Sequence, residues 1–144
     1  MNRAEIERIL PHRGSMLLLD ELIPGEDATA TAHYRVRGDE WFLQGHFPGN
    51  PIVPGVILCE CMAQTCCGLM DLGGGLPYLV RMEKAVFRHP VHPGGDLTLR
   101  CRMTRRLDPF LTAECEAWDD GRLCAQATLQ LCVKTLEHKE TSYV

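Results

Sequence analysis

The sequence has no apolar segment long enough to cross a membrane. Its longest apolar stretch lies around residues 56–63 and is interrupted by Glu60 and followed by Gln64, whereas a transmembrane helix needs about 20 predominantly apolar residues. The N-terminal segment MNRAEIERILPHR is charged and lacks the apolar centre of a signal peptide. We therefore expect a cytoplasmic protein.

The chain also lacks an excess of positive charge. Its 15 Lys and Arg residues are outnumbered by 19 Asp and Glu, which gives a formal net charge of −4 and no general basic field for nucleic acid. Basic residues do cluster locally, at 81–88 and at Arg102, Arg105 and Arg106. Such clusters are either solvated strand faces or a docking patch for an acidic partner.

No C-x-x-C motif occurs among the eight cysteines, so the sequence offers no zinc framework. Several of them stand among small apolar residues in predicted elements. We expect reduced thiols that serve as small hydrophobic side chains in a cytosolic core. Metal binding and disulfide pairing are the alternatives, and no metal or cofactor is predicted.

At 144 residues, 45% of them hydrophobic, the chain is expected to form one domain, 1–144, with a single core. Residues 4–10 predict a short helix ended by Pro11. Residues 56–72 predict one long helix, apolar nearly all round and ended by the glycines at 73–75. Strands are expected at 29–36, 78–87, 96–106, 110–118 and 123–133, and the tail from 137 is expected to fray. The pattern indicates an α+β domain with an antiparallel sheet around a buried helix.

Two titratable residues stand out, His46 in a Pro- and Gly-rich loop and Glu60 inside the apolar helix. An apolar environment raises the pKa of a carboxyl group, which would let Glu60 act as a proton donor. The free N–H of Gly55 at the helix start would hold an oxyanion. A base, an oxyanion site and an acid suit the removal of a proton next to a thioester carbonyl.

Purely structural interpretations of these residues were weighed beside the catalytic one. His46 would then be a hydrogen-bonded loop histidine, and Glu60 would pair with Arg13 or Arg81 at a subunit interface. The other five histidines, at 12, 33, 89, 92 and 138, are each expected to be structural or solvated.

Three segments resemble one enzyme family. GHFPGNPIVPGVILCECMAQ, at 45–64, resembles the signature of the (3R)-hydroxyacyl-[acyl-carrier-protein] dehydratases of type II fatty acid synthesis. ILPHRGSMLLLDEL resembles their N-terminal segment and FRHPVHPGGDLTLR a later strand pair, so the resemblance covers most of residues 5–133. Glu60, where a branch that also isomerises its product typically has Asp, places the chain with the general branch.

The resemblance implies a hot-dog fold and an obligate homodimer, often assembled as a trimer of dimers. His46 of one subunit would remove the α-proton and Glu60 of the partner subunit would protonate the departing β-hydroxyl, giving a trans-2-enoyl product. No cofactor is implied beyond the phosphopantetheine of an acyl carrier protein. The resemblance implies that the oxyanion and the substrate are bound by Gly55, Gln64, Phe47 and Val56. Gln64 would also orient the carboxyl group of Glu60. The carrier protein would dock on Arg102, Arg105 and Arg106.

Alternatives within the same fold are a thioesterase, in which Glu60 activates water without His46, and a silent subunit that binds acyl carrier protein.

Departures from the family pattern, such as Gly14-Ser15 after PHR and the cysteines flanking Glu60, affect the expected tunnel and interface. They bear on chain length, and on a specialised polyketide or lipid pathway, more than on reaction type.

Overall fold

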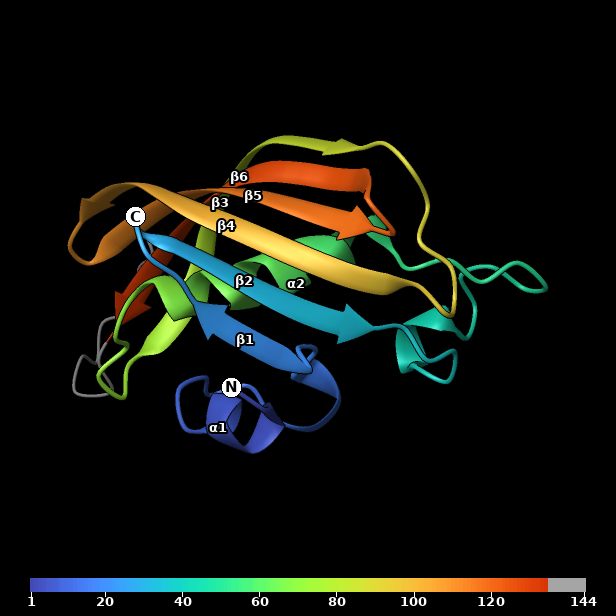
Figure 1. Cartoon of the computed structure of the whole chain (residues 1–144), viewed down its shortest axis with the longest axis horizontal. Helices are drawn as coiled ribbons and strands as arrows, with labels where there is room; N and C mark the ends of the chain where they lie inside the picture. Colours follow the sequence, from blue (N-terminus) through green and yellow to red (C-terminus); the bar gives the residue numbers. More distant parts are fainter. Residues whose placement is uncertain (135–144) are drawn as a thin grey trace.

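Six antiparallel strands form one sheet that curves over a central helix, α2 (Gly55–Cys66), in a computed structural model that describes residues 1–134 (Figure 1). The strands are, in chain order, β1 (Glu21–Pro24), β2 (Thr29–Arg35), β3 (Leu76–Phe87), β4 (Asp96–Leu107), β5 (Phe110–Asp119) and β6 (Arg122–Lys134). They lie in the spatial order β1-β2-β4-β5-β6-β3. The short strand β1 and the long strand β3 are therefore the two edges.

The strands follow the sequence pattern closely. β2 and β5 alternate buried and more exposed residues, so one face of the sheet packs on α2 and the other faces outward. Asp120 and Gly121 join β5 to β6 with φ values of +50° and +75°, the combination that a tight type I′ hairpin requires. The α+β prediction and the predicted strands are confirmed.

The central helix ends earlier than the sequence predicted. After Cys66 the chain tightens into a 3₁₀ turn, η3 (Cys67–Leu69), and Met70 is extended. A Cβ added at Gly68 would come within 3.0 Å of Leu22 and 3.3 Å of Ala30. Packing of this turn against β1 and β2, rather than the glycines at 73–75, therefore decides where the helix stops.

The N-terminal helix α1 (Arg3–Glu7) is also shorter than expected. Asn2 and Glu5 form a capping box at its start. The chain from residue 8 turns instead of continuing, because Pro11 disfavours a helical residue before it. Two further 3₁₀ turns follow, η1 (Gly14–Met16) and η2 (Trp41–Leu43).

The core lies between α2 and the inner face of the sheet. All eight cysteines are free and buried, which confirms their expected use as small core side chains. No helix among the described residues has the length and hydropathy to span a membrane. The predicted fraying from residue 137 concerns residues outside those the structure describes.

Candidate active site

His46 lies in the loop between η2 and α2, and that loop is held by its own backbone. The Ile52 N–H donates to the His46 carbonyl at 2.7 Å, and Phe47 and Asn50 exchange two backbone hydrogen bonds. The His46 ring stacks on Phe47 with centroids 4.1 Å apart, and its Nδ1 lies 3.2 Å from the Ile52 carbonyl oxygen. Because a carbonyl only accepts, Nδ1 carries the hydrogen in this bond. Nε2 is then left with the lone pair that a base needs.

The segment before the loop is fixed by a carboxylate. Glu40 accepts hydrogen bonds from the Tyr34 hydroxyl and from the N–H groups of Arg37 (2.9 Å) and Gly38 (2.7 Å). Burial raises the pKa of Glu40, but these hydrogen bonds outweigh it and hold the pKa below its usual value. An ionised Glu40 therefore ties β2 to the chain that leads into His46.

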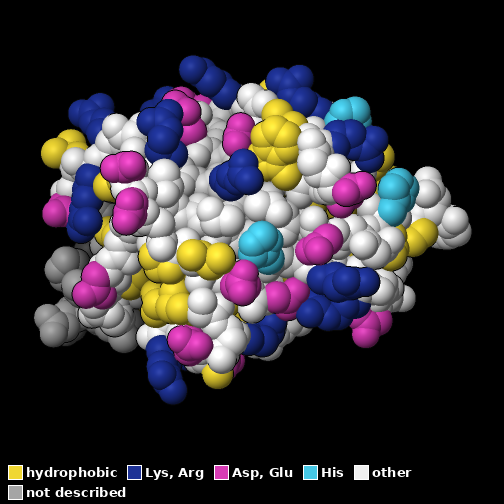
Figure 2. Space-filling view, viewed as in Figure 1, with side chains coloured by type: hydrophobic (Ala, Val, Ile, Leu, Met, Phe, Trp, Pro, Cys, Tyr) yellow, Lys and Arg dark blue, Asp and Glu magenta, His cyan; other side chains and the backbone are white. Residues whose placement is uncertain are grey.

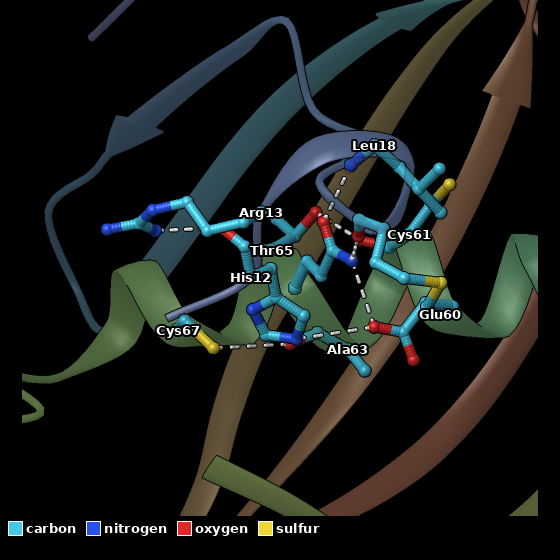
Figure 3. A network of polar contacts seen from close by, with 10 residues as sticks. His12, Arg13, Leu18, Glu60, Cys61, Ala63, Thr65 and Cys67 are labelled. Carbon is cyan, nitrogen blue, oxygen red and sulfur yellow. Dashed lines mark hydrogen bonds and ion pairs between the residues drawn. The ribbon is translucent and has the colours of Figure 1, made fainter. Parts of the chain in front are cut away.

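Glu60 projects from the second turn of α2 and is about a quarter exposed. Its Oε2 accepts a hydrogen bond from Gln64 Nε2 at 2.9 Å, and His12 Nε2 approaches the same oxygen at 3.5 Å (Figure 3). Its second oxygen receives no hydrogen bond from residues 1–134. Glu60 thus has one anchored oxygen and one that is available to a substrate.

The expectation of a raised pKa for Glu60 is wrong for this chain. Burial does raise it, but the hydrogen bonds from His12 and Gln64, together with the charge on His12, outweigh burial and lower the pKa of Glu60 below its ordinary value. The sequence showed the apolar neighbours of Glu60 along the helix. It did not show the two donors that the fold brings to the carboxylate.

Gln64 joins α2 to the N-terminal segment. It is 1% exposed, its Oε1 accepts from the Leu18 N–H at 3.1 Å, and its Nε2 also donates to the Met16 carbonyl at 2.6 Å. The predicted contact of Gln64 with Glu60 is present. The amide is held from three sides, so it fixes the direction of the Glu60 carboxylate.

His12 is the site residue that the sequence missed, since it was expected to be structural or solvated. Its Nδ1 is buried and has no hydrogen-bond partner within residues 1–134, while its Nε2 faces Glu60. Within one chain, Arg13 bonds Glu7 and backbone carbonyls and Arg81 bonds Glu83, so neither arginine contacts Glu60 of its own chain among the described residues. Pairing with either arginine across a subunit interface stays a prediction. The only signal for His12 was its place in the N-terminal segment that resembles the family.

The start of α2 presents free donors. Pro54 is the N-cap, and its carbonyl accepts from Ile57 and Leu58. The N–H groups of Gly55 and Val56 have no partner among the described residues. A Cβ on Gly55 would lie 2.9 Å from the ring of Phe87, so only glycine leaves this ring in place.

Apolar side chains surround these donors and face solvent. Val56 is 70% exposed, and Phe47 and Phe87 are each 51% exposed. The sequence identified Phe47 and Val56 but not Phe87. An exposed apolar group next to free N–H groups suits a ligand with an oxyanion and a hydrocarbon part.

His46 and Glu60 have separate sets of contacts in the described part of the chain. The contacts of His46 are with Ile52 and Phe47, and within residues 1–134 no hydrogen bond or ion pair joins it to Glu60.

The arginine cluster lies on β4 toward the β4–β5 hairpin, at the opposite end of the sheet from the loop that carries His46 (Figure 1). Arg102 pairs with Glu114 at 2.8 Å and Arg106 with Asp108 at 3.0 Å. Acidic and basic side chains are intermingled over this outer face (Figure 2). Two of the three arginines are thus locally neutralised.

Comparisons with known proteins agree on one family. The model of the FabA-like domain matches residues 10–128. The 3-hydroxyacyl-[acyl-carrier-protein] dehydratase FabZ of Lactococcus lactis subsp. cremoris is 37% identical over 134 residues, covering 90% of this chain and 92% of that protein. FabZ of Oenococcus oeni is 37% identical over 141 residues, covering 93% and 100%.

A solved structure extends the likeness to the fold. The dehydratase heterocomplex ApeI:P from Xenorhabdus doucetiae superposes with a TM-score of 0.80 at 20% identity, covering 91% of each chain. The expected hot-dog fold is confirmed. With matching segments across nearly the whole sequence, the chain belongs to the FabA-like family and, within it, to the FabZ-type 3-hydroxyacyl-[acyl-carrier-protein] dehydratases.

Proposed function

We propose that the protein converts (3R)-3-hydroxyacyl-[acyl-carrier-protein] into trans-2-enoyl-[acyl-carrier-protein] with His46 as base and Glu60 as acid. The observation that carries the proposal is the Glu60 carboxylate, fixed at one oxygen by Gln64 and open at the other. A carboxyl group held in this way delivers a proton to one place, as elimination of water requires.

The first step is removal of a proton from the carbon next to the thioester carbonyl. The His46 Nδ1–H is occupied by the Ile52 carbonyl, so Nε2 takes the proton. Negative charge then develops on the thioester oxygen. The free N–H groups of Gly55 and Val56 at the positive end of α2 hold this oxygen.

The second step is loss of the β-hydroxyl group as water. It needs a proton, whereas the pKa of Glu60 lies below its ordinary value. His12 contacts the same carboxylate oxygen. We assign His12 the role of orienting, together with Gln64, the carboxyl group of Glu60 that donates the proton to the leaving hydroxyl. His12 acts through Glu60 and is a positioning residue.

We propose that the two steps require a second subunit, with His46 of one chain facing Glu60 of the other, as the family resemblance implies. β3 supports this requirement. It is an edge strand of 12 residues that pairs only with β6, and it exposes Leu79, Met82, Val86 and Phe87. An apolar unpaired edge is a surface for pairing with another strand. We propose a homodimer formed edge to edge through β3, which can assemble further into a trimer of dimers.

The substrate partner is the acyl carrier protein, an expectation supported by the 37% identity to 3-hydroxyacyl-[acyl-carrier-protein] dehydratases. Arg105 is the most available of the three proposed docking arginines, since Arg102 and Arg106 pair with carboxylates of their own chain. A cytoplasmic location is supported by the eight free cysteines. We propose that residues 1–144 form one dehydratase domain.

The test is direct turnover of a 3-hydroxyacyl carrier-protein thioester, followed by ultraviolet absorbance and mass spectrometry. We expect the enoyl product from the wild type, and a loss of two to four orders of magnitude in His46→Ala and Glu60→Gln, the usual contribution of general acid–base groups. His89→Ala, a change at an exposed histidine, is the matched control. Free acid in place of enoyl product would establish a thioesterase, and inactivity with every chain length a silent subunit.

A further inference from the structure

Three buried thiols converge between the helix and the sheet, and the proposed reaction uses none of them. Cys66 is the last residue of α2, while Cys101 on β4 and Cys115 on β5 are direct cross-strand partners. Their sulfur atoms all lie within 4.8 Å of one another, and the sulfurs of Cys66 and Cys115 are 3.4 Å apart.

The surroundings of this trithiol cluster (Cys66, Cys101 and Cys115) are dry. The three residues are 1–2% exposed and belong to the hydrophobic core. The Cys101 thiol also approaches the Met62 carbonyl oxygen at 3.3 Å. Among residues 1–134 no other group of three cysteine, histidine or carboxylate ligands meets in this way.

We propose that the trithiol cluster binds one trivalent arsenic atom, taken up from arsenous acid, as a three-coordinate tris-thiolate. The step balances without an oxidant: arsenous acid and three thiols give the arsenic tris-thiolate and three water molecules. Three As–O bonds and three S–H bonds break, and three As–S bonds and three O–H bonds form. The proposal is independent of the dehydratase assignment.

The spacing suits a single central atom. An atom bonded to each sulfur at about 2.3 Å, the length of a zinc–thiolate bond, holds its sulfurs roughly 3.5–4 Å apart. The sulfurs of Cys66 and Cys115 already lie at that separation, and the third lies within 4.8 Å of both. A small rotation of one side chain completes the site.

Charge favours a trivalent centre such as arsenic over divalent and monovalent soft ions. Trivalent arsenic with three thiolates is neutral, whereas Zn²⁺ would leave a net charge of −1 and Cu⁺ a net charge of −2 on the same ligands. An uncompensated charge is costly in an apolar core. Zinc also takes a fourth ligand in structural sites, and the cluster supplies three.

The first experiment mixes folded wild-type protein with sodium arsenite and records native mass spectra. We expect a gain of one arsenic atom and a loss of three hydrogens for each chain, with a raised Tm because the ligand binds the folded state. X-ray absorption at the arsenic edge should find three sulfur neighbours and no oxygen.

The variants Cys66→Ala, Cys101→Ala and Cys115→Ala should each lose the one-per-chain stoichiometry and the rise in Tm. Cys→Ser at the same positions keeps the size of the side chain and serves wherever an alanine variant does not fold. Cys61→Ala and Cys124→Ala, also at buried cysteines, are matched controls and should bind as the wild type does.

Three results would overturn the proposal. One is a folded wild type that takes up no arsenic. Another is equal binding by wild type and Cys115→Ala, which would place the metalloid on other cysteines. The third is tighter binding of Zn²⁺ than of arsenite, which would refute the argument from a neutral complex.

Discussion

Gln64→Ala tests whether the buried amide joins the N-terminal segment to α2 and holds the acid. The change removes three hydrogen bonds, each worth about 1 kcal/mol net, and the one to the ionised Glu60 somewhat more. It also leaves the buried Leu18 N–H without a partner, at about 1–3 kcal/mol. We expect the free energy of unfolding to fall by about 4–6 kcal/mol.

The measurement is urea denaturation at one fixed protein concentration, because the stability of an oligomer depends on concentration. Gln130→Ala, which removes an amide from the outward-facing side of β6, is the control and should change stability by no more than about 0.5 kcal/mol. A loss below about 1 kcal/mol for Gln64→Ala would refute the reasoning, since the amide would then contribute little to holding the two segments together.

Four further changes test other parts of the proposed mechanism. His12→Gln removes the charge that lowers the pKa of Glu60, so the pH dependence of kcat should move upward; an unchanged profile would contradict the pairing. The pKa of Glu60 is lower in the folded chain than in the unfolded chain. The ionised carboxylate therefore contributes fully to stability at any pH above its unfolded pKa of about 4.3, and this contribution is lost as the pH falls through the lower, folded-state pKa. Acid denaturation of wild type and Glu60→Gln should therefore converge at low pH, and a constant difference would disprove the linkage. Gly55→Ala places a Cβ 2.9 Å from the aromatic ring over the helix start and should lower kcat/KM about 100-fold, whereas Gly45→Ala, which has open space, should not. Met82→Lys puts a charge on the β3 edge and should give an inactive monomer by light scattering; an active monomer would exclude the edge-to-edge dimer.

The sheet could be predicted from the sequence because its signals are local. Alternating burial and turn residues such as Asp120-Gly121 act within a few positions, so the limits of the five predicted strands were correct to within one or two residues. The short edge strand β1 was not predicted. The end of α2 could not be predicted in the same way. It depends on how closely Gly68 approaches β1 and β2, which are distant in the sequence.

In the candidate site, too, features that depend on local sequence could be predicted, and features that depend on distant residues could not. His46 and Glu60 are conspicuous because their residue types are unusual in a turn-rich loop and in an apolar helix. The protonation of Glu60 was predicted with the wrong sign, because its pKa depends on two donors and one of them, His12, lies 48 positions away in the sequence. Local composition reports the cost of burying a charge but not the partners that offset it.

The strand order also imposes a sequence of events on synthesis. β3 occupies residues 76–87, yet among the strands of residues 1–134 its only neighbour in the sheet is β6, which ends at Lys134. A nascent chain can therefore fold β1, β2, α2, β4 and β5 together while β3 still has no place in the sheet. The edge proposed for dimerisation becomes available only when the last strand has left the ribosome. Subunit association through this edge must therefore wait for β6, and until then the long apolar strand lacks its sheet partner and is open to mispairing.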